Sequence, residues 1–248
     1  MKLIALVLFI VSGYVHADSK RIDVIVGVSD GFPVYYFDKQ EQVFKGPMIE
    51  SFEAICREAN FNCIFRALPK KRIETELIEG SIHFGTVINS ASQAALLKEM
   101  VYFTEFNAPA SLGIYSTLPS GEIPEDLEAY YGESIICVLG WSLSVLPGIW
   151  EAEKLEQVTI FKPSTIDAAV RMLKLNRSKF LYANKQKMDV YITEQDGLHY
   201  KEFKSLNQTF GLSLASPQYQ RIKQKVDTAI STLLIRGVID PVTGHLAK

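Results

Sequence analysis

Three cysteines and four histidines are the residues of this 248-residue chain that most often carry nucleophilic, redox or metal chemistry. Cys56 and Cys63 have six residues between them, and a predicted helix, turn and strand can bring their Cα atoms within disulfide range. Cys137 lies in a short apolar run, which favours a buried free thiol over a reactive thiolate. The histidines show no metal-ligand spacing, so neither a metal nor a cofactor is expected.

General acid–base chemistry has few candidates in this sequence. Glu50, Glu105 and His83 could hold or move a proton, but none of them lies in a recognisable catalytic arrangement. His83 falls in a predicted strand, where a structural role is the plainer interpretation. The sequence therefore predicts no catalytic residue and no enzyme.

The charge balance and the hydrophobic fraction limit the classes of protein to which the chain can belong. Lys and Arg number 26 against 28 for Asp and Glu, so there is no positive excess of the kind that nucleic-acid binders carry. Hydrophobic residues make up 48%, which suits a packed core rather than disorder. The length allows one large domain or two small ones.

The first 17 residues have the three-part pattern of a secretory signal peptide. Lys2 is followed by an apolar run over residues 3–11 and by small and polar residues that end at Ala17. The apolar run is well below the roughly 20 residues that a membrane span needs, so cleavage is favoured over anchoring. We therefore expect an exported, periplasmic chain, in a compartment that permits disulfides.

The remaining sequence alternates between strand and helix patterns, which predicts an α/β fold with mainly parallel sheets flanked by helices. Before residue 117, strands are expected over 21–28, 61–67, 81–88 and 111–116, helices over 47–59 and 71–79, and a loop over 29–38. After it, strands are expected over 134–139, 157–161, 180–182 and 188–193, and helices after residue 142 and over 164–175 and 216–236. The restart near residue 117 indicates two lobes.

Four local features resemble those of periplasmic solute-binding proteins of ABC importers, in particular the amino-acid-type family 3. They are the aromatic loop Phe32-Pro33-Val34-Tyr35-Tyr36-Phe37-Asp38, the helix start Gly46-Pro47-Met48-Ile49-Glu50, the short helix that ends at Gly80, and the segment Val101-Tyr102-Phe103-Thr104-Glu105. Cys56 and Cys63 also resemble a disulfide of the basic-amino-acid binders. The features occur in the family's order over the whole mature chain, so the sequence is identified as resembling a divergent member.

The resemblance implies a two-lobed type II clamshell. Lobe one would contain residues 18–110 and 211–248, and lobe two residues 111–210, with chain crossings near 107–112 and 210–212. A monomer would bind a small-molecule ligand in the cleft between the lobes and deliver it to an ABC permease. The alternatives are a sensory protein that partners a membrane receptor and, as a weaker one, a dehydratase-like enzyme.

Two ionic groups that the family uses for α-amino acids are missing. In the family, an Arg binds the ligand carboxylate and an acid binds the ligand ammonium. The corresponding stretch 89–95 lacks the Arg, and the stretch 179–184 lacks the acid. An ordinary α-amino acid is therefore not expected as ligand, and the ligand's identity stays open.

The residues predicted to bind the ligand come from both lobes, and each has a plainer alternative. The aromatic ones can stack on a ligand or pack in a core, and Asn89 and Ser90 can bond a ligand or cap a helix. Trp141 and Ser142 lie where backbone N–H groups of lobe two could bind an anion, and the arginine can reach the cleft or face solvent. The predicted set is Phe32, Tyr35, Tyr36, Arg72, Asn89, Ser90, Trp141, Ser142 and Tyr182.

Overall fold

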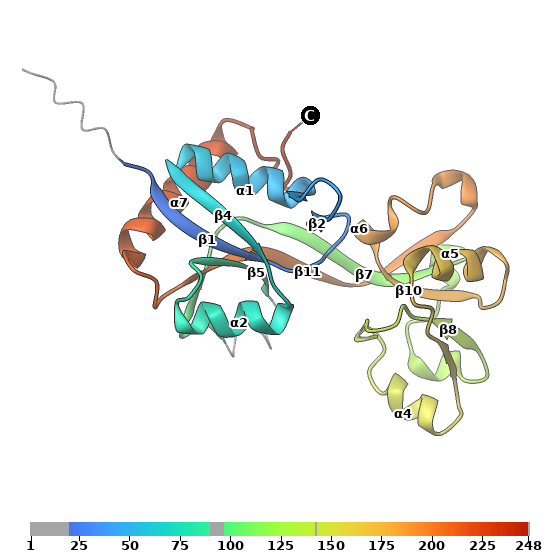
Figure 1. The fold of residues 1–248 in the computed structure, drawn as a ribbon. Coiled ribbons are helices and arrows are strands. Elements are labelled where there is room, and N and C mark those ends of the chain that lie inside the picture. The colour runs from blue at the N-terminus through green and yellow to red at the C-terminus, as the bar shows by residue number, and fades with distance from the viewer. Residues whose placement is uncertain (1–19, 90–96, 142, 248) are drawn as a thin grey trace, which may run out of the picture.

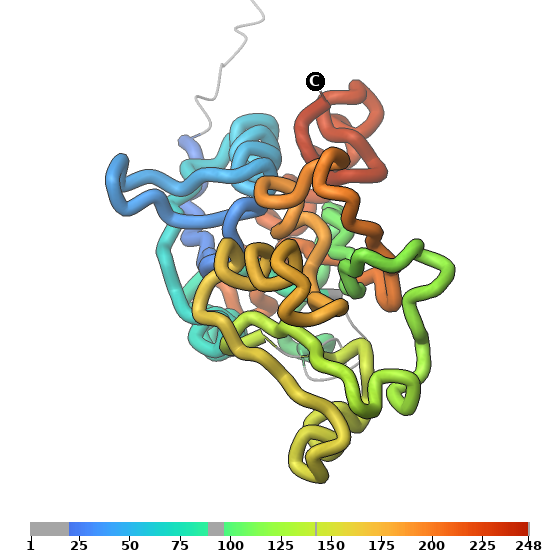
Figure 2. Tube along the Cα trace, turned by 90° about the vertical axis from the view of Figure 1, so that its right-hand side faces the viewer, coloured from blue at the N-terminus to red at the C-terminus, as the bar shows by residue number. Residues whose placement is uncertain are grey.

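The structure is a computed structural model that describes residues 20–89, 97–141 and 143–247. The predicted signal peptide lies outside these ranges. The described chain forms two lobes side by side, joined by long strands that run through both (Figure 1). Figure 2, in which lobe two faces the reader, shows its yellow and orange segments in front of the blue and teal segments of lobe one.

Lobe one consists of strands with helices on both faces. Its elements are β1 (Ile22–Val28), β2 (Tyr36–Asp38), β3 (Val43–Lys45), α1 (Pro47–Glu58), β4 (Phe61–Ala67), α2 (Lys70–Glu79), β5 (Phe84–Asn89), β6 (Val101–Phe103) and α7 (Tyr219–Ile235). Figure 1 shows α1 and α7 on one face of the sheet and α2 on the other. As predicted, α1 begins at Pro47, whose fixed φ suits a first helical turn, and α2 ends at Gly80, which adopts a left-handed φ of 76°.

Lobe two is smaller and has shorter elements. They are two 3₁₀ turns (Ser120–Glu122 and Leu127–Tyr130), β8 (Ser134–Ile136), α4 (Ile149–Lys154), β9 (Thr159–Phe161), α5 (Ile166–Lys174), β10 (Phe180–Asn184), α6 (Lys185–Met188) and a further 3₁₀ turn (Glu194–Asp196). The hydroxyl of Thr165 caps α5 by accepting a hydrogen bond from the Ala168 N–H.

Two strands cross between the lobes: β7 (Ala108–Ser116) and the 15-residue β11 (His199–Ser213). They pair antiparallel and lie at the centre of a nine-stranded sheet with the order β4-β1-β5-β11-β7-β10-β8-β9, to which β6 is added by pairing with β11. The outer pairs β1–β4, β1–β5, β8–β10 and β8–β9 are parallel. The predicted α/β class is confirmed, and the sheet is mixed because the crossing strands are antiparallel to their neighbours.

The buried apolar side chains form separate clusters in the two lobes. In lobe one, Phe52 of α1 stacks on Phe210 with ring centroids 3.9 Å apart, and Ile73 of α2 packs in a second cluster on the opposite face. In lobe two, the buried Tyr130 packs edge-on against Phe180 at 4.8 Å, in a cluster that contains no buried residue of lobe one. Each lobe thus has its own core.

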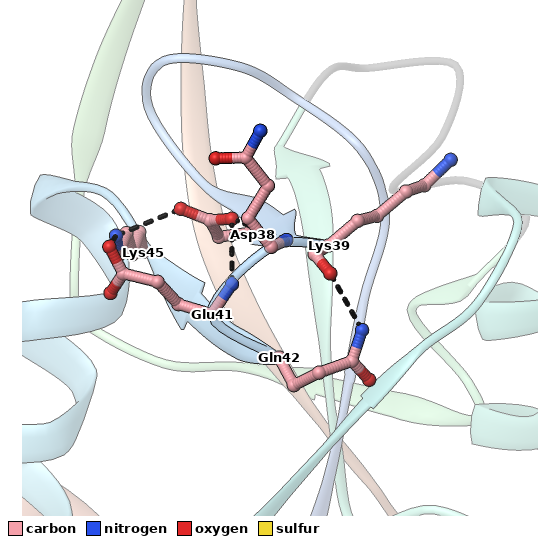
Figure 3. Close-up of polar contacts among 6 residues, drawn as sticks. Asp38, Lys39, Glu41, Gln42 and Lys45 are labelled. Carbon is pink, nitrogen blue, oxygen red and sulfur yellow. Dashed lines mark hydrogen bonds and ion pairs between the residues drawn. The ribbon is translucent and has the colours of Figure 1, made fainter.

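The loop predicted over 29–38 ends in a hairpin formed by β2 and β3. Figure 3 shows how Asp38 closes its turn by accepting hydrogen bonds from the Glu41 N–H at 3.2 Å and the Lys45 ammonium at 2.8 Å. Hydrogen bonding from Lys45 lowers the pKa of the Asp38 carboxyl. The hairpin follows Tyr35 directly and holds the end of the aromatic loop.

Among the differences from the predicted elements, two bear on the cleft. Residues 188–193, predicted as a strand, are the end of α6 and a turn, in which Tyr191 N–H and Ile192 N–H both bond the Met188 carbonyl. The strand β11 was missed, because its first half is an irregular mixture of exposed and half-buried residues that gives neither a continuous apolar run nor a clear alternation. Among the described residues, no helix combines the length and the apolar character of a membrane span.

Candidate functional site

A cavity of about 780 Å³ opens between the two lobes, and residues of both lobes and of the crossing strands line it. Such clefts are the usual ligand sites of α/β proteins. The lining residues are Ser29, Asp30, Tyr35, Pro69, Lys70, Glu74, Ile88 and Leu97 from lobe one, Ala110, Leu112, Lys204, Leu206 and Gln208 from the crossing strands, and Trp141, Ser144, Tyr182, Asn184 and Lys187 from lobe two.

The lobe-one wall is built at the carboxyl ends of two parallel strands. Val28, the last residue of β1, is in register with Ala67, the last residue of β4, so the segments that follow them begin side by side. One segment supplies Ser29 and Asp30, and the other leads into α2 through Pro69. Open α/β sheets bind ligands at this edge, because the loops that leave it converge there.

The lobe-two wall follows the same rule and is largely aromatic. Tyr182 lies on β10, and Trp141 follows β8, the parallel neighbour of β10. The two rings meet edge to face with centroids 6.4 Å apart. Burial raises the pKa of the Tyr182 hydroxyl, and its hydrogen bond with Ser144 acts in the opposite direction. This wall offers flat apolar surface with hydroxyls at its edge, which suits a ligand that has an apolar part.

The floor of the cleft is formed by one face of the two crossing strands, to which every second residue of a strand contributes its side chain. Side chains two apart on a strand share one face, which explains why Lys204, Leu206 and Gln208 of β11 line the cavity together. The register places Leu206 opposite Ala110 and Lys204 opposite Leu112. The floor therefore combines apolar side chains with one amide and one ammonium.

Charged groups face each other across the cleft. Lys187 lies after β10 in lobe two, and Asp30 lies in lobe one. Burial lowers the pKa of the Lys187 ammonium, and the negative charge of Asp30 partly opposes that shift. Burial likewise raises the pKa of the Tyr35 hydroxyl, which hydrogen bonds with Ser29. The cleft thus keeps partly desolvated polar groups where a ligand would contact them.

The structure brings three of the predicted ligand-binding residues to the cleft, namely Tyr35, Trp141 and Tyr182. Phe32 and Tyr36 are not among the described lining residues; their rings contact each other edge to face at 4.8 Å. Asn89 ends β5 and pairs with Asn207 of β11. Ser90 and Ser142 lie outside the described residues.

Arg72 lies in a different place from the one predicted. Its guanidinium donates to the buried Glu76 at 2.7 Å, and both residues line a separate hollow of about 550 Å³. The reason is helical geometry: residues four apart share a helix face, so Lys70 and Glu74 face the cleft while Arg72 and Glu76 face away from it.

Several cleft residues were missed by sequence reasoning. Lys204 and Gln208 were missed with the strand that carries them, because Leu206 is the one apolar residue of the segment 204–208 and gives no period-two pattern. Lys187 lies between the predicted strands 180–182 and 188–193, where no element was predicted, and the structure places it on α6. The acids and lysines that line the cleft are absent from the predicted set of ligand-binding residues.

The cysteines and His83 have the predicted structural roles. Cys56 and Cys63 form a disulfide with Cα atoms 6.2 Å apart, and Cys137 is buried and free. Burial raises the pKa of the Cys137 thiol to about 11, so little thiolate is present at neutral pH. His83 Nδ1 accepts a hydrogen bond from the Ile25 N–H at 3.1 Å, which joins its segment to β1. In the part of the chain that the structure describes, no His, Cys, Asp and Glu side chains gather into a metal site.

No family model and no curated protein matches the chain. Solved structures do. An ancestral arginine-binding protein bound to arginine matches with a TM-score of 0.59 and 18% identity, over 88% of this chain and 95% of that one. The arginine-, lysine-, histidine-binding protein ArtJ from Geobacillus stearothermophilus matches with a TM-score of 0.56 and 17% identity, over 87% and 90%. This chain has the two-lobed clamshell fold of periplasmic binding proteins.

A further clamshell among the matches is a histidine kinase sensor domain with similarity to periplasmic binding proteins. It matches with a TM-score of 0.59 and 13% identity, over 88% of this chain and 94% of that one. The resemblance inferred from the local motifs is thus confirmed at the level of the fold. Proteins that bind amino acids and a domain that senses both have this clamshell, so the fold by itself does not choose between transport and sensing.

Proposed function

We propose that the chain is a non-catalytic, exported binding protein that holds a small polar solute in the cleft between its lobes. The observation that carries the proposal is the cleft itself, whose walls come from two separately packed lobes and whose floor is two crossing strands. Bending of those strands would close the lobes on a ligand and remove it from water. The lobes proposed are residues 18–110 with 211–248, and 111–210; the separate cores support this division, with Phe210 at the boundary packing in the core of lobe one.

Delivery to an ABC importer in the periplasm is the leading form of this function. It rests on the signal-peptide pattern of residues 1–17 and on the clamshells that match this chain, several of which bind arginine, lysine or histidine. Sensing through a membrane receptor is the second form, and the match to the histidine kinase sensor domain favours it. Permease and ATPase genes next to this gene would support delivery, and receptor or kinase genes would support sensing.

Catalysis is not part of the proposal. The titratable groups of the cleft include Asp30, Glu74, Lys70, Lys187 and Lys204, and none of them forms the nucleophile–base pair of a covalent mechanism. Turnover of a bound ligand would contradict this point.

The test is a ligand screen read by protein stability and by Trp141 fluorescence. The chain has two tryptophans, and Trp150 lies outside the cleft, so a Trp150→Phe variant reports on Trp141 alone. A ligand at a hundred times its Kd should stabilise the protein by about 2.7 kcal/mol and change the Trp141 emission.

The screen should include organic acids, amines, sugars and the α-amino acids. We expect binding of a solute that is not an amino acid, because residues 89–95 lack the Arg with which the family binds the carboxylate of its ligand. Stabilisation without a Trp141 signal, or no binder in any class, would contradict the proposed site.

A further inference from the structure

Lys187 is set apart from the other lysines of the cleft by its surroundings. It is half-buried on the lobe-two wall, whereas Lys70 and Lys204 are exposed. Its ammonium lies 5.7 Å from the centroid of the Trp141 ring. Among the described residues, no acceptor forms a hydrogen bond or an ion pair with it.

The neighbouring Lys185, on the same short helix α6, differs from Lys187 in its exposure and in its ion pair. Lys185 is exposed, and its ammonium pairs with the Asp189 carboxylate at 3.2 Å. Lys187, two residues on, points to the opposite side and into the cleft, where Asp30 is the acid that acts on it across the opening without an ion pair. A half-buried ammonium without a paired anion is unfavourable, because the water that is removed is only partly replaced by the cation–π contact with the Trp141 ring.

We propose that Lys187 anchors the anionic group of the ligand, and that the ligand class is a small organic anion whose apolar part packs on Trp141 and Tyr182. This inference rests on the proposed binding function and specifies its ligand. The ammonium lies beside the aromatic wall. A ligand whose anionic group is one or two bonds away from its ring or apolar chain would therefore contact both the ammonium and the aromatic side chains. Burial lowers the pKa of the Lys187 ammonium, which is consistent with a group that a bound ligand anion would stabilise.

The position of the anchor also sets the orientation of the ligand. The acids of the cavity, Asp30 and Glu74, belong to lobe one, and Lys187 belongs to lobe two. An anion bound at Lys187 therefore faces lobe two, and any cationic or donor group of the ligand faces lobe one. Closure of the lobes would then bring both walls onto one ligand.

The experiment compares matched acids and amides on the full mature chain. The probes are phenylacetate with phenylacetamide, indole-3-acetate with indole-3-acetamide, and nicotinate with nicotinamide, together with the neutral and cationic compounds of the wider screen. Binding is measured by calorimetry for the wild type and for Lys187→Met, with Lys185→Met as the control on the same helix.

We expect the acids to bind and their amides to bind at least tenfold more weakly. Lys187→Met should weaken the binding of the acids by about tenfold or more, whereas Lys185→Met should leave it unchanged. The unliganded Lys187→Met variant should be at least as stable as the wild type, because it removes a partly buried charge that has no ion pair with any described residue and keeps an apolar side chain beside Trp141. This second readout separates a binding role from a structural one.

Four outcomes overturn the inference. If ligands bind but only neutral or cationic ones do, or if acids bind equally well to Lys187→Met, the proposed function stands and the anchor does not. If Lys187→Met unfolds more easily than the wild type, the residue has a structural role. If no compound of any charge binds, the proposed function fails, and the anchor fails with it.

Discussion

Gly113 lies where the two crossing strands meet, and replacing it by alanine is the sharpest test of their packing. A Cβ at this position would be 2.0 Å from the carbonyl oxygen of Lys201 and 2.7 Å from the ring of Tyr200. Gly113 pairs with Glu202 of β11 on one side and with Ala183 of β10 on the other. Because β7 is held on both edges, it cannot shift aside to make room.

The size of the effect follows from these distances. Real Cβ atoms essentially never come closer than 3.0 Å to such neighbours, so the Lys201 backbone would have to move by about an ångström or more. Overpacking of a close-packed site costs about 1–3 kcal/mol, occasionally more. The nearest atom here belongs to the backbone, which cannot adopt another rotamer, so we expect the Gly113→Ala variant to lose about 3 kcal/mol.

The measurement is the free energy of unfolding from urea titrations followed by circular dichroism. The control is Gly121→Ala, in an exposed 3₁₀ turn where an added Cβ has no neighbour within 4 Å, and its stability should stay within about 0.5 kcal/mol of the wild type. If Gly113→Ala is as stable as Gly121→Ala, the close pairing of β7 and β11 described above is incorrect.

Three further predictions concern other parts of the molecule. Reducing the Cys56–Cys63 disulfide should lower the free energy of unfolding by about 2–3 kcal/mol in the wild type and have no effect on the double alanine variant; equal effects would refute this. Burial lowers the pKa of His83, so the unfolded chain binds a proton more readily, and stability should fall as pH drops below about 6.5. His83→Gln should flatten that pH dependence, and an unchanged slope would contradict it. Ser111→Ala removes the hydroxyl that bonds Tyr200 at 2.8 Å on the crossing strands and should cost about 1–3 kcal/mol in urea unfolding; no loss would argue against this contact.

Helices and parallel strands were predictable because their signals are local. The run Pro47 to Glu58 shows a proline start and an apolar face that is buried against β1, and the structure places the helix there. The disulfide was predictable for the same reason, since its partners are close in sequence on consecutive elements. Apolar patterns of this kind depend only on nearby residues and survive in any tertiary context.

The long strand β11 was not predictable in the same way. Its first half is stabilised by β7, a strand about 90 residues earlier, rather than by a continuous apolar face of its own. The cleft residues that it carries were missed with it. Arg72 was expected in the cleft because the sequence does not show which face of a short helix packs on its neighbours; Glu76, which is buried and accepts from Arg72, decides that face.

The sequence by itself determined the α/β class, the division into two lobes, the disulfide and the aromatic character of the cleft at Tyr35, Trp141 and Tyr182. These follow from local periodicity, from spacing and from motifs. Only the tertiary structure decided which charges line the cleft. Lys187, Asp30 and Lys204 come from three segments that meet only when β7 and β11 join the lobes. That Lys187 has no ion-pair partner among the described residues is visible only when those surroundings are in place. A charge is ordinary on a solvated surface and functional in a partly desolvated cleft, and that difference depends on long-range packing.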